Sequence, residues 1–188
     1  MLLKPLIRSR DEHVSATVRQ VFESAGIAPT PAALDAYRQA WDRYTHTDAE
    51  AVGLLSALRE RGLSIGVLSN TLWPADWHRE IFERDGVAAL IDAAVYSSEV
   101  PWTKPHPETF RTAMAALGTT NPASCCFVGD RLFEDIYGAR NVGMRTVLVP
   151  HSAVPDDELG CSAGQPDAVV QRLSEVLDVL EAWCDFQS

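Results

Sequence analysis

The sequence predicts an α/β fold built on a doubly wound parallel sheet. Three observations carry this prediction. Short apolar segments alternate with helix-length amphipathic segments from residue 63 onward, polar residues follow the apolar segments, and 188 residues is the length of one domain. Such alternation requires crossovers that place helices on both faces of the sheet. With 46% hydrophobic residues, the chain has enough apolar side chains for an ordinary buried core.

Three helices are expected before the first strand. They cover residues 12–25, 31–44 and 48–61. In each of them apolar residues recur on one helical face, and a glycine ends the first and the third. Thr30 followed by Pro31 is typical of a helix start, because the hydroxyl caps the first turn and proline tolerates the first helical position. The first two helices therefore read as a paired unit.

Strands and helices alternate over the rest of the chain. Strands are expected over residues 63–68, 90–96, 124–128 and 145–149, and helices over residues 74–84, 107–117, 132–142 and 167–180. Pro150 ends the last strand, and residues 151–165 read as a loop because glycine and proline interrupt them. Asp167 is expected to cap the final helix.

Composition excludes several classes of partner and site. The chain carries a net charge of −10 and has no basic cluster, so no nucleic acid and no anionic membrane surface is expected as a partner. No apolar run reaches the ~18 to 20 residues of a membrane span, and no secretion signal is visible, so a cytoplasmic location is expected. The four cysteines are expected to be free thiols, and the five histidines show no zinc spacing.

Polar side chains follow each of the first three core strands. Ser69 and Asn70 follow the first, Lys104 lies in the loop after the second, and Asp130 follows the third, with Asp135 one turn later. Ligands of parallel sheets bind beyond the carboxyl ends of the strands. Ser69 and Asn70 can donate hydrogen bonds to phosphate, Lys104 can neutralise its charge, and Asp130 suits Mg²⁺, which prefers oxygen ligands. Asp135 either binds the metal through water or orients Lys104.

Each of these residues alone is also typical of an ordinary turn, cap or solvated surface. Their joint occurrence, in this order and each after a strand, favours a site for a phosphate with a divalent cation. The sequence contains neither a GxxxxGK[ST] nor a GxGxxG motif, which excludes P-loop and dinucleotide sites.

Three segments resemble motifs of the haloacid dehalogenase superfamily. They are Val67-Leu68-Ser69-Asn70-Thr71, Lys104-Pro105-His106-Pro107 and the stretch from Phe127 to Ala139, which contains Gly129-Asp130 and Asp135. The similarity runs from about Glu12 to Val149 and points to the phosphoglycolate-phosphatase-like branch. It implies a helical cap over residues 1–47 and a Rossmann-like core over residues 48–188.

The resemblance also implies roles for the site residues. Ser69 would bind the phosphoryl group, Lys104 would stabilise it, Asp130 would ligate Mg²⁺, and Asp135 would support both the metal and the lysine. The expected ligand is a small phosphorylated substrate. The short cap leaves the site open, which is consistent with a protein or bulky substrate or with closure by the partner in a homodimer, and the sequence does not decide among these.

The first motif of the superfamily has no match in the sequence. That motif is an apolar strand followed by Asp-x-Asp-Gly, in which the first aspartate is the nucleophile and the second is the general acid and base. The chain contains no Asp-x-Asp triplet, and no apolar strand precedes Asp11. We therefore expect the chain to begin just after this motif, so that the central strand between those ending at Ser69 and Asp130 is absent.

Three functions remain open at this point. The first is a Mg²⁺-dependent phosphomonoester phosphatase that forms an aspartyl phosphate in its full-length form and is inactive as this chain. The second is a non-catalytic module that binds a phospho-ligand or a protein. The third is dehalogenase or phosphonatase chemistry; the Gly129-Asp130 metal signature argues against a dehalogenase, which needs no Mg²⁺.

Overall fold

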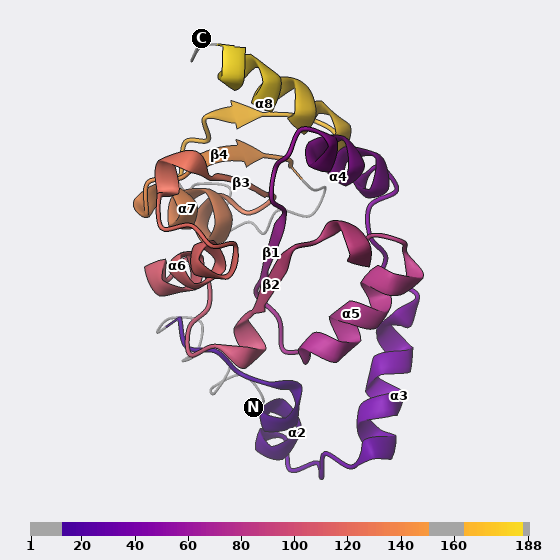
Figure 1. The fold of residues 1–188 in the computed structure, drawn as a ribbon. Helices are drawn as coiled ribbons and strands as arrows, with labels where there is room; N and C mark the ends of the chain where they lie inside the picture. Colours follow the sequence, from indigo (N-terminus) through magenta and orange to yellow (C-terminus); the bar gives the residue numbers. More distant parts are fainter. Residues whose placement is uncertain (1–12, 151–163, 186–188) are drawn as a thin grey trace.

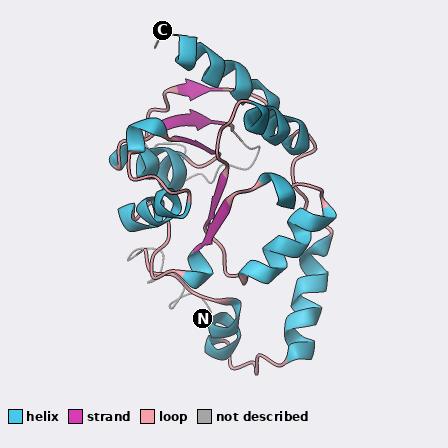
Figure 2. Ribbon diagram, viewed as in Figure 1, coloured by secondary structure: helices cyan, strands magenta, loops and turns pink. Residues whose placement is uncertain are grey.

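The computed structural model describes residues 13–150 and 164–185, and helices alternate along them with short parallel strands (Figures 1 and 2). The helices are α2 (Val18–Ser24), α3 (Pro31–Asp42), α4 (Ala51–Glu60), α5 (Ala75–Arg84), α6 (Pro107–Ala116), α7 (Gly138–Asn141) and α8 (Val176–Asp185). The strands are β1 (Gly66–Ser69), β2 (Ala93–Tyr96), β3 (Cys126–Gly129), β4 (Arg145–Leu148) and β5 (Ala168–Val169). The predicted α/β class is confirmed.

The strands form two parallel ladders. β1 pairs with β2, and β3 pairs with β4, which in turn pairs with β5. Within residues 13–150 and 164–185 no ladder joins β1 to β3. The sequence places a missing central strand between these two, and that placement stays a prediction.

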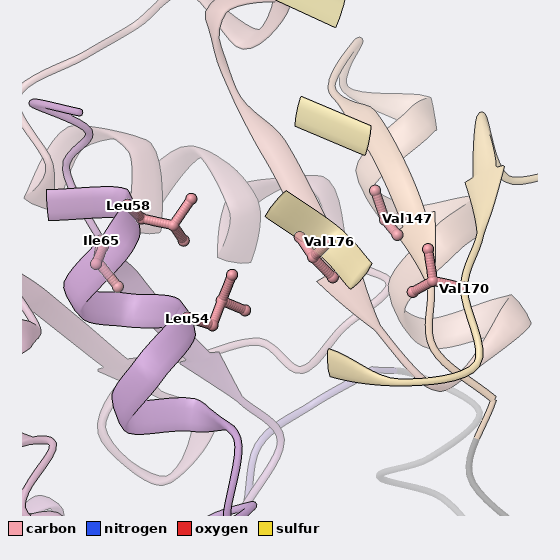
Figure 3. Packing of buried hydrophobic residues seen from close by; sticks show 6 residues of the cluster. All are labelled: Leu54, Leu58, Ile65, Val147, Val170 and Val176. Atoms are coloured by element: carbon pink, nitrogen blue, oxygen red, sulfur yellow. The ribbon is translucent and has the colours of Figure 1, made fainter. Parts of the chain in front are cut away.

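Helices cover both faces of the second ladder, and the side chains of β3 alternate between them. Cys126 and Val128 pack with a cluster formed by α4, β4, α8 and the residues next to β1 and β5, which Figure 3 shows. That cluster consists of Leu54, Leu58, Ile65, Val147, Val170 and Val176. Phe127 points to the opposite cluster, where Phe110 of α6 and Ala139 of α7 are fully buried. Burial on both faces is the doubly wound arrangement that the sequence predicts.

The first helix begins later than predicted. Glu12 lies outside the described residues, and α2 starts at Val18 because Thr17 caps it: the Thr17 hydroxyl accepts from the Gln20 N–H at 3.3 Å, and the Gln20 side chain accepts from the Thr17 N–H at 2.8 Å. Val14 instead forms an antiparallel bridge with Trp102. Pairing with a distant loop therefore overrides the helical pattern in residues 13–16.

The final helix also begins later than predicted. Ala168 and Val169 pair with β4 as β5, and α8 starts at Val176. Asp167 accepts from the Thr146 N–H at 2.8 Å, so it fixes a strand end instead of capping a helix. Of the other predicted elements, β1 and β3 begin later than predicted and end one residue later, at Ser69 and Gly129, and the predicted helix over residues 132–142 is a π-helical turn over Leu132–Tyr137 followed by α7. The remaining elements exist with shorter bounds. The predicted 151–165 loop falls largely outside the described residues.

The predicted cap helices α2 and α3 lie away from the sheet, and α3 runs beside α5 (Figure 1). Arg38 of α3 forms an ion pair with Glu80 of α5 at 2.5 Å, and Arg84 of α5 forms another with Asp42 at 3.1 Å. The division of the chain at residue 47 stays a prediction.

The described residues add two findings on charge and polarity. No helix among them has the length and apolar character that crossing a membrane requires. Cys125 and Cys126 are free thiols, and burial raises the pKa of Cys126 to about 12, so its thiol stays protonated at neutral pH. Cys161 lies outside the described residues.

Candidate functional site

Three loops meet at the carboxyl ends of the strands. Asn70 follows β1, Lys104 lies in the loop after β2, and Asp135 lies in the π-helical turn Leu132–Tyr137 that follows β3. Direct hydrogen bonds join Asn70 to Lys104 and Lys104 to Asp135. The structure therefore brings together residues that are separated by up to 65 positions in the sequence.

Lys104 and Asp135 form a buried ion pair. The Lys104 Nζ lies 2.5 Å from the Asp135 Oδ1, and the two side chains are only 10% and 4% exposed. The same Nζ lies 5.2 Å from the centre of the Phe127 ring. The Lys104 ammonium therefore lies at the edge where the loops meet, with its charge balanced by Asp135. This contact is the one required by the second of the two sequence-based alternatives for Asp135, in which it orients Lys104.

The second oxygen of Asp135 fixes the turn after β3. Its Oδ2 accepts from the backbone N–H groups of Asp130 and Arg131, each at 3.1 Å. The N–H groups of Asp135 and Ile136 both donate to the Arg131 carbonyl, which gives the turn its wide start. Both carboxylate oxygens of Asp135 therefore have partners within the chain, and these contacts use three of the roughly four lone-pair sites of the carboxylate.

Gly129 is required for this arrangement, because a Cβ at this position would lie 2.5 Å from the Asp135 Cβ and 2.6 Å from its Cγ. We expect Gly129→Ala to displace Asp135 and to lower the free energy of unfolding by about 1–3 kcal/mol, the usual cost of overpacking. Gly53→Ala is the control: it adds the same methyl group in α4, where nothing lies within 4 Å, and is expected to stabilise by up to about 1 kcal/mol. Urea denaturation measures both. Equal effects of the two variants would contradict the packing argument.

Asp130 is the accessible carboxylate of the site. Its side chain is 47% exposed, and its ion-pair contact with Arg131 is loose, with 3.7 Å between the Asp130 Oδ2 and the Arg131 Nε. No group of three or more His, Cys, Asp or Glu side chains that could hold a metal occurs among the described residues. Mg²⁺ commonly takes only one or two carboxylates and completes its shell with water and phosphate. Asp130 is suited to be such a carboxylate ligand.

The last residue of β1, Ser69, and the two residues that follow it have different partners. Both polar atoms of the Asn70 side chain bind the backbone of Lys104. The Thr71 hydroxyl accepts from the Trp73 N–H at 3.0 Å and lies 3.0 Å from the His78 Nε2. The Ser69 hydroxyl makes no hydrogen bond to any of the described residues, so of the three it is the one left for a ligand.

Residues after β2 brace the same loop. The Ser97 hydroxyl accepts from the Thr71 N–H at 2.8 Å and donates to the Thr71 carbonyl at 3.0 Å. Glu99 accepts from the Ala75 N–H at 3.0 Å, at the start of α5. Ser97 is 2% exposed. The sequence marks polar residues here but gives no sign that they hold the neighbouring loop, because this pairing depends on the register of β1 against β2.

His78 contacts the Thr71 hydroxyl and stacks on Tyr96, with 4.4 Å between the two ring centroids. Burial lowers the pKa of His78 below its ordinary value of 6.5, although Glu99 opposes this. The unfolded chain therefore binds more protons than the folded chain as the pH falls below 6.5, and stability is lost in that range.

We expect His78→Phe to remove this loss while keeping the stack on Tyr96. The free energy of unfolding of the wild type should fall relative to that of the variant when urea denaturation is repeated below pH 6.5. If the wild type and the variant lose the same stability on acidification, His78 is not the group responsible.

Comparison with known proteins agrees with the geometry. Residues 101–176 match the model of the HAD-hydrolase-like family. The chain is 33% identical over 159 residues to the glyceraldehyde 3-phosphate phosphatase of Methanopyrus kandleri, covering 82% of this chain and 67% of that protein. It is 35% identical over 161 residues to the phosphoserine phosphatase of Thermus thermophilus, covering 84% of this chain and 61% of that protein.

A solved structure is similar over nearly the whole chain. It is the HAD phosphatase from Thermococcus onnurineus, with a TM-score of 0.69, 24% identity, and coverage of 95% of this chain and 77% of that one. The shared architecture supports the fold independently of the motifs. The chain spans about two thirds or less of the length of the two curated relatives above.

Proposed function

Because the chain belongs to the haloacid dehalogenase-like hydrolase family, we propose that its site serves Mg²⁺-dependent hydrolysis of a small phosphomonoester. The observation that carries this proposal is the juxtaposition of a buried Lys104–Asp135 pair with the exposed carboxylate of Asp130. The first provides a fixed positive charge and the second an oxygen ligand. The two relatives described above are named for small phosphorylated compounds, which supports the substrate class.

Each residue of the proposed site has a different role in holding the phosphoryl group. The Ser69 hydroxyl donates a hydrogen bond to a phosphoryl oxygen, and the Lys104 ammonium offsets the negative charge of the group. Asp135 holds the ammonium in place and, through its other oxygen, holds the backbone beside Asp130. Mg²⁺ held by Asp130 would stabilise the charge that develops on the phosphoryl oxygens. Positioning and charge compensation are the main contributions a protein makes to phosphoryl transfer.

The attacking group in the proposed reaction is an aspartate carboxylate that accepts the phosphoryl group before water releases it. The family resemblance implies this aspartate within an Asp-x-Asp-Gly motif, which the 188 residues do not contain. We therefore propose that this chain binds the phosphoryl group and the metal but does not by itself turn over substrate.

The absence of an Asp-x-Asp triplet from the chain also favours a second candidate, a non-catalytic phospho-ligand-binding module. Both candidates need the same cradle of Ser69, Lys104 and Asp130. They differ in whether adding an Asp-x-Asp-Gly segment to the chain produces hydrolysis. Sedimentation of the purified chain, which measures the mass of the assembly in solution, tests whether the chain forms a homodimer.

Binding is tested by the stability of the chain in the presence of MgCl₂ and inorganic phosphate. We expect inorganic phosphate at about 100 times its dissociation constant, added to the chain in the presence of saturating MgCl₂, to raise the free energy of unfolding by about 2.7 kcal/mol beyond the effect of MgCl₂ alone. Phosphate with EDTA, and MgCl₂ without phosphate, are the controls for general salt effects. Stabilisation that is merely the sum of the two controls would contradict a shared site.

A further inference from the structure

Asn70 makes a reciprocal pair of hydrogen bonds with the backbone of one residue. Its Nδ2 donates to the Lys104 carbonyl at 3.0 Å, and its Oδ1 accepts from the Lys104 N–H at 2.7 Å. Both contacts are partly buried and span 34 positions in the sequence. The two bonds also fix the orientation of the amide, because a flipped amide would place donor against donor and acceptor against acceptor.

We propose that Asn70 is a positioning residue, which holds the backbone of Lys104 so that its ammonium reaches the phosphoryl site. This role rests on the proposed function, since it concerns the charge that Lys104 presents there. It differs from the sequence-based expectation for Asn70, in which the side chain itself binds phosphate. That expectation would require the amide to give up its bonds to Lys104.

The need for such a residue follows from the nature of lysine. A lysine side chain has four rotatable bonds, so fixing only its backbone or only its ammonium leaves the rest of the side chain free to change conformation. In this structure Asp135 holds the tail at the Nζ, and Asn70 holds the backbone. Lys104 is thereby attached at one end to the loop after β1 and at the other to the turn after β3.

The neighbouring backbone is also tied, but to other partners. The Thr103 N–H donates to the His13 carbonyl at 2.8 Å, and the His106 N–H donates to the Thr103 carbonyl at 2.9 Å. Neither bond involves an atom of Lys104. Among the described residues, Asn70 is the side chain that binds the N–H and the carbonyl of Lys104 itself.

Two variants provide matched controls. Thr71→Val changes the adjacent residue and removes a hydroxyl whose partners are Trp73 and His78, not Lys104. Asn121→Ala removes the same amide as Asn70→Ala, but at a turn where the side chain accepts from the Ala123 N–H at 3.2 Å. The first tests a general disturbance of the loop, and the second tests the loss of any capping asparagine.

The composition of the chain allows a direct readout. Lys4 and Lys104 are its only two lysines, so a protein labelled with ¹³C at the lysine ε-carbon gives two NMR signals, and Lys4→Arg assigns them. We expect the Lys104 signal to be displaced from that of free lysine, because its Nζ lies 5.2 Å from the Phe127 ring centre.

Asn70→Ala is expected to move the Lys104 signal toward the free-lysine value, while Thr71→Val and Asn121→Ala leave it in place. An unmoved signal in Asn70→Ala, or an equal movement in Thr71→Val, would overturn the proposal. Hydrogen exchange of the Lys104 amide in the wild type gives a test that does not depend on a variant folding. Protection of that amide supports the bond to Asn70, and exchange at the rate of an unstructured chain overturns it.

These results are separable from those on function. The signal of Lys104 reports its position without any ligand. If the wild type fails to bind inorganic phosphate with Mg²⁺ while the three variants behave as expected, the proposed function is refuted and the positioning by Asn70 stands.

Discussion

Asp135→Ala is expected to lower the free energy of unfolding by about 3–5 kcal/mol, the largest loss of stability among the changes considered for this protein. The substitution leaves the Lys104 ammonium buried, with 10% of its side chain exposed and no carboxylate beside it. It also removes the acceptor of the Asp130 and Arg131 N–H groups. Urea denaturation followed by tryptophan fluorescence measures the loss.

Arg111→Ala is the matched control, because it breaks an ion pair of the same 2.5 Å length with Glu108 whose side chains are 55% and 53% exposed. Such exposed pairs contribute about 0–1 kcal/mol. If Asp135→Ala cannot be purified folded, Lys104→Met tests the same pair from the other side. A loss for Asp135→Ala no larger than for Arg111→Ala would contradict the argument that burial makes this pair necessary.

Asp130→Asn is expected to abolish the stabilisation by MgCl₂ and phosphate together while leaving the fold intact. The Asp130 side chain is 47% exposed and its nearest ion-pair contact is 3.7 Å long, so the folded chain depends little on its charge. An amide oxygen without a negative charge is a weaker ligand for a hard cation. Calorimetric titration and thermal unfolding with both ligands measure the effect.

Asp35→Asn, an exposed aspartate on α3, removes the same charge away from the site. It controls for the change in net charge and is expected to bind as the wild type does. Unchanged Mg²⁺-dependent binding by Asp130→Asn would remove Asp130 from the proposed site.

The order of the elements could be predicted from the sequence because it follows from local patterns. Thr30 before Pro31 predicted the start of α3 correctly, since the Thr30 hydroxyl accepts from the Ala33 N–H within the same turn. Asp167 has the same capping chemistry, but its carboxylate binds Thr146 in the neighbouring strand. A helix cap can be predicted from the sequence when the capping side chain bonds to a residue nearby in the chain. The prediction fails when its hydrogen-bond partner is distant in the chain.

The same distinction applies to the site. Polar residues after the strands predicted where Ser69, Lys104 and Asp130 would lie, because parallel strands bring their carboxyl ends to one edge. The sequence did not predict that Asn70 binds the Lys104 backbone or that Ser97 braces Thr71. Those contacts depend on the register of β1 against β2, in which Ser69 stands opposite Tyr96, and no local pattern encodes that register.

The most direct test of the central claim is the hydrolysis of an aryl phosphate, with and without Mg²⁺, by this chain and by the same reading frame extended upstream of Met1. We predict Mg²⁺-dependent release of phosphate by the extended protein, its loss in the extended Asp130→Asn variant, and no turnover by the 188-residue chain. Hydrolysis by neither protein, or hydrolysis that persists in EDTA, would contradict the proposal that this site belongs to a magnesium-dependent phosphatase.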